Sequence, residues 1–458
     1  MRHIAACIRY NLRMDFAAAQ EFVLSLEHGK MDFDLTRLRR VLDALGVAEP
    51  PYPIAIVGGT NGKGSAVVIT EAILAPHLRV GSFVKPHIFQ LNERARVGGQ
   101  PIGEGDFTAA VEEVKRYLDR GEDKLTFFEA TLAVALLAFR RAQVDIGLIE
   151  VGLGGRFDAA NVLPRVLTVI TGISREHEQF LGRNLSEIAF EKAGIMREGV
   201  PVVLSRDIVR QPVDVMDFLV RLASLKRAPV QQLPAHAAHD GGSLSPAVQT
   251  FALERRHDAP VRLPERLSLN LLGAYQERNL EVALAMVEAL AANRHIPAIE
   301  VPPRLTVNYR GRFEPHELGR GLIVFDAAHN PEGCQALAKS LSTYFAPHER
   351  FFTLFGCQEG KDVQAMLKAL APWVEALLPL RVEVLHPMSQ QTIVEAAHTQ
   401  AIEVAGEGAS LPEQADYLKG VAMEGARVLV CGSCYYLGEV MEALGFGCRA
   451  SQASEEGS

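Results

Sequence analysis

The segment IAIVGGTNGKGSAVVITEAIL, residues 54–74, decides the fold class. It opens with apolar residues typical of a buried strand, continues with four glycines around Lys63 and ends in a helical pattern. These are the parts of a phosphate-binding loop, because glycines let backbone N–H groups approach oxyanions and a helix N-terminus favours negative charge. The common form of this loop places serine or threonine directly after the lysine. Here Gly64 separates Lys63 from Ser65, so the sequence predicts a nucleotide site with an unusual spacing.

Strand-like and helix-like segments alternate along the rest of the chain. Apolar periodicity predicts helices at residues 32–46, 128–141, 274–292 and 331–345. Short runs rich in β-branched residues predict strands at 145–151, 166–173, 321–329, 351–356 and 426–433. Such alternation is typical of βαβ units. We therefore expect an α/β protein: an N-terminal P-loop domain with a mostly parallel sheet flanked by helices, plus a smaller C-terminal Rossmann-like α/β domain.

The segment HIPAIEVPPR, residues 295–304, is the best candidate for a domain boundary because it contains three prolines. We expect a nucleotide-binding domain with an N-terminal helical segment at 1–302, a second domain at 303–449 and a disordered tail at 450–458. Residues 231–247 contain many breakers and show no period, so loop or irregular β structure is expected there.

Composition narrows the class of protein. A formal net charge of −8 argues against a nucleic-acid surface as the main function. No apolar run reaches the ~18–20 residues of a membrane-spanning helix, and the opening segment lacks the apolar core of a secretory signal. Cys431 and Cys434 form a CxxC pair, which without a second pair is weak evidence for zinc. We expect a cytoplasmic enzyme that contacts neither membrane nor nucleic acid.

Polar residues follow two further strands of the predicted sheet. Glu150 ends one strand and precedes a glycine-rich turn, and Glu176 and His177 follow another. Ligands bind at the carboxyl ends of strands in open α/β sheets. A carboxylate there is often only solvated, and a lone histidine is more often structural than a ligand. Beside a phosphate loop, however, an oxygen donor is a candidate ligand for Mg²⁺.

Motifs in this order along most of the chain resemble the folylpolyglutamate synthase/dihydrofolate synthase family of the Mur-ligase superfamily. The matching motifs are GTNGKGS (59–65), NERARVGG (92–99), FFEA (127–130), EVGLGGRFDA (150–159), HEQFLG (177–182), EKAGI (191–195), GRFE (311–314), DAAHNPEG (326–333) and CGSCYYLGEV (431–440). In this family a glycine regularly follows the loop lysine. The resemblance implies an ADP-forming amide ligase that phosphorylates a carboxylate with ATP and passes the acyl group to an amino acid.

The resemblance also implies roles for individual residues. It implies ATP contacts at Gly59, Thr60, Asn61, Gly62, Lys63, Gly64, Ser65, Asn279, Arg312 and Asp326. It implies two Mg²⁺ ions and ligands at Ser65, Glu150, His177 and Lys192, the lysine being carbamylated in relatives. It implies substrate contacts at Lys85, Asp158, His329 and Ser433, and direct catalytic participation of Lys63, His177, Lys192, Arg312 and His329.

Three positions depart from the family pattern. Lys85 replaces a serine that binds metal in relatives, Glu176 replaces an aspartate, and Ala160 replaces a threonine. Three hypotheses follow. The first is ligation of glutamate to dihydropteroate or folate. The second is ligation of an amino acid to another carboxylic acid. The third is a protein that binds nucleotide without ligating anything. The resemblance implies small-molecule substrates and a monomer.

Overall fold

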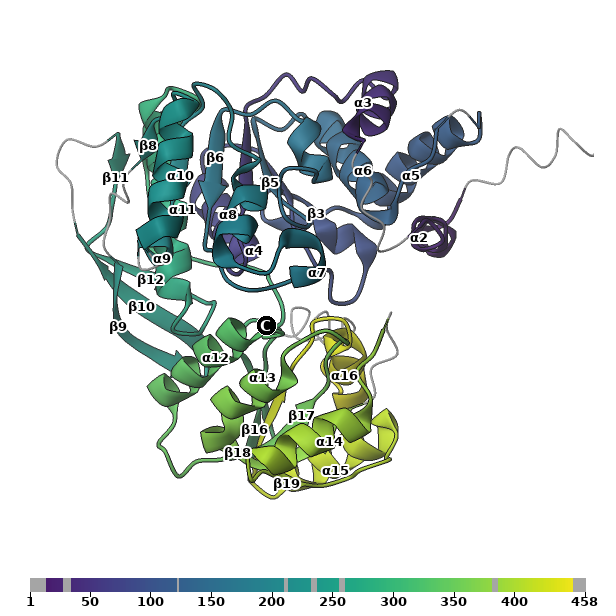
Figure 1. Ribbon diagram of the computed structural model, residues 1–458, viewed down its shortest axis with the longest axis vertical. Coiled ribbons are helices and arrows are strands. Elements are labelled where there is room, and N and C mark those ends of the chain that lie inside the picture. The colour runs from purple at the N-terminus through teal and green to yellow at the C-terminus, as the bar shows by residue number, and fades with distance from the viewer. Residues whose placement is uncertain are drawn as a thin grey trace, which may run out of the picture.

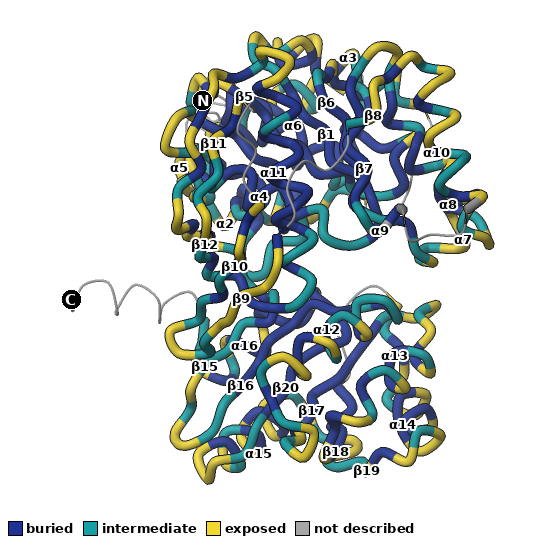
Figure 2. The backbone as a smooth tube through the Cα atoms, turned by 90° about the vertical axis from the view of Figure 1, so that its left-hand side faces the viewer, coloured by how far each residue is buried: buried dark blue, intermediate teal, exposed yellow. Residues whose placement is uncertain are grey.

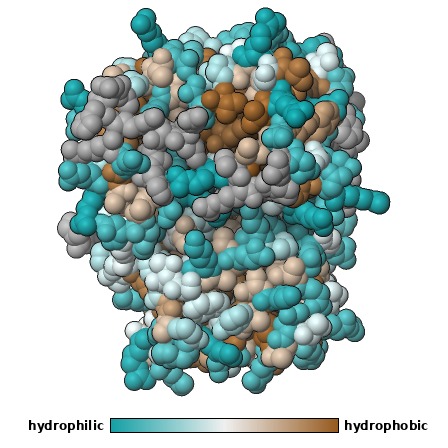
Figure 3. All heavy atoms as spheres, turned by 60° about the vertical axis from the view of Figure 1, so that its left-hand side comes forward, coloured by the Kyte–Doolittle hydropathy of each residue, from teal (hydrophilic) through white to brown (hydrophobic). Residues whose placement is uncertain are grey.

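The computed structural model describes residues 14–27, 34–121, 123–209, 213–231, 237–254, 260–380 and 386–447. Figures 1 and 2 show two α/β bodies, one above the other, with the N-terminal half of the chain in the upper one. Among the described residues, no helix is long and apolar enough to span a membrane. Most of the face drawn in Figure 3 carries polar or weakly hydrophobic residues. The predicted tail at 450–458 lies outside the described residues.

The upper body is built on a sheet of eight strands in the order β4-β3-β2-β5-β1-β6-β7-β8. Its strands are β1 (Ile54–Gly58), β2 (Val80–Phe83), β3 (Ala95–Val97), β4 (Gln100–Pro101), β5 (Ile146–Glu150), β6 (Leu167–Ile170), β7 (Val202–Leu204) and β8 (Val230–Gln231). All neighbours are parallel except the β2–β3 and β3–β4 pairs. Since β1 lies between β5 and β6, the segments that follow these three strands meet at one edge of the sheet.

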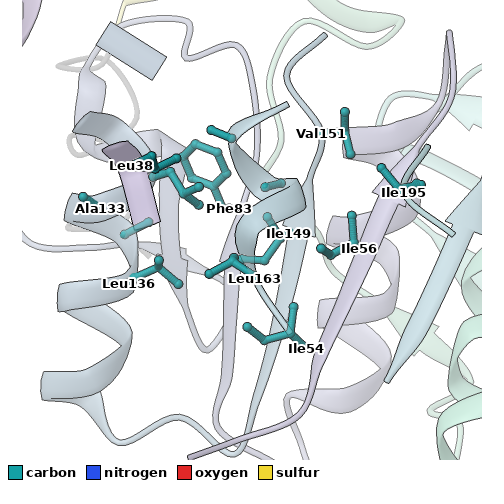
Figure 4. Close-up of a cluster of buried hydrophobic side chains, with 14 of the residues drawn as sticks. Leu38, Ile54, Ile56, Phe83, Ala133, Leu136, Ile149, Val151, Leu163 and Ile195 are labelled. Atoms are coloured by element: carbon teal, nitrogen blue, oxygen red, sulfur yellow. The ribbon is translucent and has the colours of Figure 1, made fainter. Parts of the chain in front are cut away.

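Helices cover both faces of this sheet because successive strand residues point to opposite sides. Ile54 and Ile56 of β1 belong to a core with α3 and α6, drawn in Figure 4, whereas Ala55 and Val57 belong to a core with α4 and α11. The helices of this body are α2 (Phe16–Leu24), α3 (Leu35–Ala44), α4 (Lys63–Leu74), α5 (Glu104–Leu118), α6 (Phe127–Ala142), α7 (Glu178–Leu181), α8 (Leu185–Ala193), α9 (Arg206–Val209), α10 (Val213–Leu225) and α11 (Gln276–Ala292).

The segment expected to be loop or irregular β structure contains part of an antiparallel hairpin whose register shifts between Gln249 and Phe251. Strand β9 (Ala237–Leu244) pairs antiparallel with β10 (Ala247–Leu253), within a four-stranded sheet of order β14-β12-β10-β9. Strand β9 could not be predicted from the sequence because most of its residues are exposed and therefore do not alternate between apolar and polar. The remaining short strands are β11 (Val261–Arg262), β12 (Arg266–Leu269), β13 (Ile299–Glu300) and β14 (Arg304–Leu305).

Residues just beyond the predicted boundary at 302 pair and pack with the upper body. Strand β14 pairs with β12 of the upper body. Leu305 and Val307 belong to the upper core, whereas Phe313 belongs to the lower one. We therefore propose that the first domain ends between Val307 and Phe313.

The lower body has a six-stranded sheet in the order β15-β16-β20-β17-β18-β19, parallel except for β15. Its strands are β15 (Glu314–Leu318), β16 (Gly321–Phe325), β17 (Phe351–Phe355), β18 (Val374–Pro379), β19 (Glu403–Val404) and β20 (Arg427–Cys431). Its helices are α12 (Pro331–Tyr344), α13 (Val363–Leu370), α14 (Gln390–Thr399), α15 (Leu411–Met423) and α16 (Leu437–Leu444). The predicted two-domain α/β fold is confirmed.

Candidate active site

The glycine-rich loop between β1 and α4 is shaped by close neighbours. Gly59 and Gly62 have φ values of +133° and +83°, which side chains rarely adopt. A Cβ atom on Gly59 would lie 2.1 Å from the Thr171 hydroxyl, and one on Gly62 would lie 2.3 Å from Asn279 Oδ1. The structure thus places Asn279 of α11 directly against the loop, next to the residues predicted to bind phosphate.

Gly64, the residue that makes the spacing unusual, is required by sterics. A Cβ atom at this position would lie 2.1 Å from the Tyr309 hydroxyl and 3.0 Å from Glu150 Oε2. The same hydroxyl donates a hydrogen bond to the Lys85 carbonyl at 3.2 Å. Ser65 follows in the first turn of α4 and is buried. The glycine therefore lets Tyr309, from the link between the bodies, close over the phosphate loop.

The side chain of Lys63 folds back over its own loop. Its Nζ atom donates to the carbonyls of Gly59 at 2.9 Å and Thr60 at 2.7 Å. Burial, together with the positive charge of Lys85, lowers the pKa of Lys63 to about 8. The Lys63 ammonium group therefore has two neutral acceptors within its own loop.

Lys192 forms a buried ion pair with Glu176. Its Nζ atom donates to Glu176 Oε1 at 2.9 Å and to the Gly59 carbonyl at 3.0 Å, and the two side chains are 1% and 6% exposed. Burial alone would raise the pKa of Glu176, but the charges of Lys192 and Lys63 outweigh it and lower the pKa to about 2. Lys192 thus has a buried carboxylate as its partner.

Three further predicted residues lie around the carboxyl ends of β2 and β5. Glu150 is buried, and its Oε2 atom accepts a hydrogen bond from the backbone N–H of Lys85 at 3.0 Å. Asp158 accepts from the backbone N–H groups of Leu153 at 2.8 Å and Ala160 at 2.9 Å, so it holds the glycine-rich turn in shape. Burial raises the pKa of Asp158 to about 6, while the Lys85 charge acts to lower it.

Two histidines face the same region from different bodies. Burial and the charge of Lys361 lower the pKa of His177 to about 3, and that of His329 to about 4. His329 Nδ1 lies 2.9 Å from the Ala327 carbonyl. Because a carbonyl only accepts, Nδ1 carries the proton and Nε2 keeps a lone pair. Both imidazoles are therefore neutral near pH 7.

Arg312 lies at the junction of the two bodies. Its guanidinium group stacks over the Tyr309 ring at 5.0 Å and donates to the Gly311 carbonyl at 2.9 Å. Asp326 accepts from the Tyr275 hydroxyl at 2.7 Å and from the Phe313 N–H at 2.9 Å. Asp326 thus fixes the backbone beside Arg312. The sequence analysis predicted only a nucleotide contact for Asp326 and not this structural role.

Comparison with known proteins places the chain in a family. Residues 311–434 match the family described as Mur ligase, glutamate ligase domain. The dihydrofolate synthase/folylpolyglutamate synthase of Bacillus subtilis is 32% identical over 362 residues, which covers 76% of this chain and 82% of that protein. The chain belongs to the dihydrofolate synthase/folylpolyglutamate synthase family.

Solved structures of family members resemble this one over nearly their whole length. Escherichia coli FolC in complex with DHPP and ADP has a TM-score of 0.77 and 26% identity, with 96% of this chain and 99% of that chain covered. A bifunctional folylpolyglutamate synthase/dihydrofolate synthase with Mn, AMPPNP and L-glutamate bound has a TM-score of 0.73 and 25% identity, with 94% and 98% covered. The sequence-based assignment to this family is confirmed.

In this member of the folylpolyglutamate synthase family, two positively charged residues near the candidate site were not predicted from the sequence. Lys361 lies in the segment after β17, and after burial its charge is the next cause of the lowered pKa of both His177 and His329. Arg94 is buried, donates from Nε to His87 Nδ1 at 2.9 Å and lies over the Phe127 ring at 4.8 Å. The available signal for Lys361 was its position just after a strand of the second parallel sheet.

Among the described residues, no group of three or more His, Cys, Asp or Glu side chains could hold a metal by itself. Glu150 supplies carboxylate oxygens and His177 a neutral nitrogen. Mg²⁺ commonly takes one or two protein ligands and fills its other positions with water and substrate phosphates. The residues present therefore fit a Mg²⁺ ion that is bound partly by protein side chains and partly by the phosphates of the nucleotide.

The last predicted residue is Ser433, which follows β20 in the lower body. It is buried, and its Oγ atom accepts from the Tyr435 N–H at 3.3 Å. With His329 after β16, it stands at the carboxyl edge of the lower sheet. The structure thus divides the predicted residues between two sheet edges, with the loop and Glu150 on one and His329 and Ser433 on the other.

Proposed function

We propose that this protein uses ATP to join glutamate to a pteroate or folate carboxylate, releasing ADP and phosphate. The observation that carries this proposal is that both halves of a ligase site come from one chain. The phosphate loop, Glu150 and Lys192 lie on the upper body, while His329 and Ser433 lie on the lower one. A single chain therefore supplies a complete site, which supports activity as a monomer.

In the first step, an oxygen of the substrate carboxylate attacks the γ-phosphorus of ATP, and the bond to the bridging oxygen of ADP breaks. Charge develops on the transferring phosphoryl group, where fixed cations are most effective. We propose that Lys63, Lys85 and Arg312 supply this charge, since Lys63 lies in the loop, the Lys85 charge acts on Lys63, and Arg312 stacks on Tyr309 beside the loop.

In the second step, the amine nitrogen of glutamate attacks the acyl carbon, and phosphate leaves. The nitrogen must lose a proton. His329 is suited to accept it, because the Nδ1–H donates to the Ala327 carbonyl and the lone pair remains on Nε2. We propose that Lys361, whose charge acts on His329, binds a carboxylate of the incoming amino acid.

We propose Mg²⁺ as the metal, held by Glu150, His177 and Ser65. It would neutralise phosphate charge and orient the γ-phosphoryl group. The second predicted site needs Lys192 as a carbamate. Glu176 opposes that state, because the ammonium of Lys192 is its ion-pair partner at 2.9 Å. We therefore propose that the first metal site is the one occupied during turnover and that Glu176 keeps Lys192 cationic.

A panel assay tests the proposed function. Purified protein is incubated with ATP, Mg²⁺, an acid and an amino acid, while phosphate and amide product are measured together. We expect phosphate release to require all three substrates, with dihydropteroate or a reduced folate as acid and glutamate as amine. If another acid supports turnover and folates do not, the folate assignment is wrong. ATP binding without amide formation from any acid would contradict the ligase assignment itself.

A further inference from the structure

Glu332 of the lower body contacts the phosphate loop of the upper body. Its Oε2 atom accepts hydrogen bonds from Asn61 Nδ2 at 2.6 Å and from Ser174 Oγ at 2.5 Å. Asn61 is part of the loop, and Ser174 lies in the segment that follows β6. One carboxylate oxygen thus joins the two segments between which the nucleotide phosphates are expected to lie.

A second interaction reinforces this contact. Asn330 Nδ2 donates to Asn61 Oδ1 at 3.1 Å, and Asn61 Nδ2 lies 3.4 Å from Asn330 Oδ1. Asn330 also caps α12, accepting from the Gly333 N–H at 2.7 Å. The first turn of α12 is therefore fixed to the loop through two residues, Asn330 and Glu332.

The same turn carries the predicted acceptor of the amine proton. His329 directly precedes Asn330, so the contacts of Asn330 and Glu332 set the position of His329 relative to the loop. On the upper side, the Ser174 N–H donates to Thr60 Oγ1 at 3.0 Å, and the Thr171 hydroxyl donates to the Asn61 carbonyl at 2.6 Å. A continuous series of hydrogen bonds therefore connects the phosphate loop to Asn330, the residue that follows His329.

We propose that Glu332 and Ser174 are positioning residues that lock the lower body onto the phosphate loop, so that the amine site is held over the activated carboxylate. The inference rests on the proposed ligase function and deepens it. Hydrogen bonds to a charged group are stronger than neutral ones, and loss of one partner leaves the other unsatisfied. Closure excludes water from a site in which an acyl phosphate would otherwise hydrolyse.

The variants that test this are Glu332→Ala, Glu332→Gln and Ser174→Ala. In Glu332→Ala we expect a rise of about tenfold in the KM for the amino acid, with a smaller change in the KM for ATP. Phosphate release should exceed amide formation, because the acyl phosphate is exposed to water. Glu332→Gln keeps an oxygen that accepts both hydrogen bonds, so it should restore one phosphate per amide.

Glu395→Ala is the matched control, since it removes an exposed glutamate from α14 of the same body. Ser174→Ala provides a second approach should Glu332→Ala fold poorly, and the effects of the two alanine variants should be less than additive because they remove the same interaction. A Glu332→Ala or Ser174→Ala enzyme with the wild-type amino-acid KM and one phosphate per amide would overturn the proposal.

Solution scattering separates this inference from the ligase assignment. With a non-hydrolysable ATP analogue bound, wild type and Glu395→Ala should have the smaller radius of gyration of the closed form, and Glu332→Ala a larger one. If wild type forms no amide with any acid, the proposed function fails, yet this difference would still support the lock. Equal radii for wild type and Glu332→Ala would contradict the lock whatever the activity.

Discussion

Gly64 shows how a single missing Cβ atom sets the geometry of the site. Replacing a glycine in a helix by alanine usually stabilises the protein by about 1 kcal/mol. Here Gly64→Ala should instead weaken ATP binding strongly, because the new Cβ would lie 2.1 Å from the Tyr309 hydroxyl. Adding Tyr309→Phe should restore part of the affinity, since it removes that oxygen. Calorimetric titration with ATP checks this, and an unimpaired Gly64→Ala protein would refute the steric account.

Lys85 contributes charge where a serine was expected. Burial and the Lys85 charge together lower the pKa of Lys63, and the same charge acts on Asp158. We expect Lys85→Ser to raise the KM for ATP about tenfold, as one cation is removed from the anion site. Initial rates at varied ATP and Mg²⁺ measure this. A faster enzyme with a steeper Mg²⁺ dependence would instead mean that Lys85 obstructs the metal.

His87 links stability to pH. Its Nδ1 atom accepts from Arg94 Nε, and burial together with the Arg94 charge lowers the pKa of His87 from 6.5 to about 3. Below pH 6.5 the unfolded chain therefore binds a proton at His87 that the folded protein does not bind, so the free energy of unfolding falls as the pH is lowered. His87→Asn keeps an acceptor and removes the titration. Between pH 7.5 and 5, wild type should lose up to about 2 kcal/mol more than His87→Asn in urea unfolding; equal losses would exclude His87.

At the scale of elements, a buried ion pair joins the phosphate-loop helix to β3, the strand next to edge strand β4. Arg96 of β3 donates to Glu71 of α4 at 2.9 Å, with both side chains at most 3% exposed. Removing one partner leaves a buried charge, so Arg96→Met should cost about 3–5 kcal/mol, and adding Glu71→Met should recover much of it. Urea unfolding measures both. Lys115→Met, which breaks an exposed pair with Asp119, should cost less than about 1 kcal/mol.

Elements with a buried face were predictable from sequence, and elements without one were not. Strand β1 and helix α6 follow from continuous apolar character, since β1 is buried at every position. Strand β9 exposes most of its residues and is defined by its pairing with β10. Likewise, the phosphate loop was evident locally, whereas the contacts of Glu332 and Tyr309 with it depend on residues more than 200 positions away.

At the scale of the whole molecule, Tyr275 and Asp326 hold the two bodies together on the side of the link. The Tyr275 hydroxyl donates to Asp326, whose other partners include the Phe313 N–H. Tyr275→Phe leaves a buried carboxylate with one donor fewer, which should cost about 1–3 kcal/mol. In differential scanning calorimetry of Tyr275→Phe, we expect the two bodies to unfold at separate temperatures. Tyr417→Phe on the exposed face of α15 should leave the profile unchanged.

The position of Lys63 has a consequence for ligand discrimination. Its ammonium already has two carbonyl partners in the loop, so a ligand must offer better acceptors before the lysine leaves them. Phosphate oxygens meet this condition because charge-assisted hydrogen bonds are about twice as strong as neutral ones. The hydroxyl groups of a nucleoside do not meet it. We therefore expect the carbonyl contacts of Lys63 to favour binding of polyanions over uncharged molecules of the same shape.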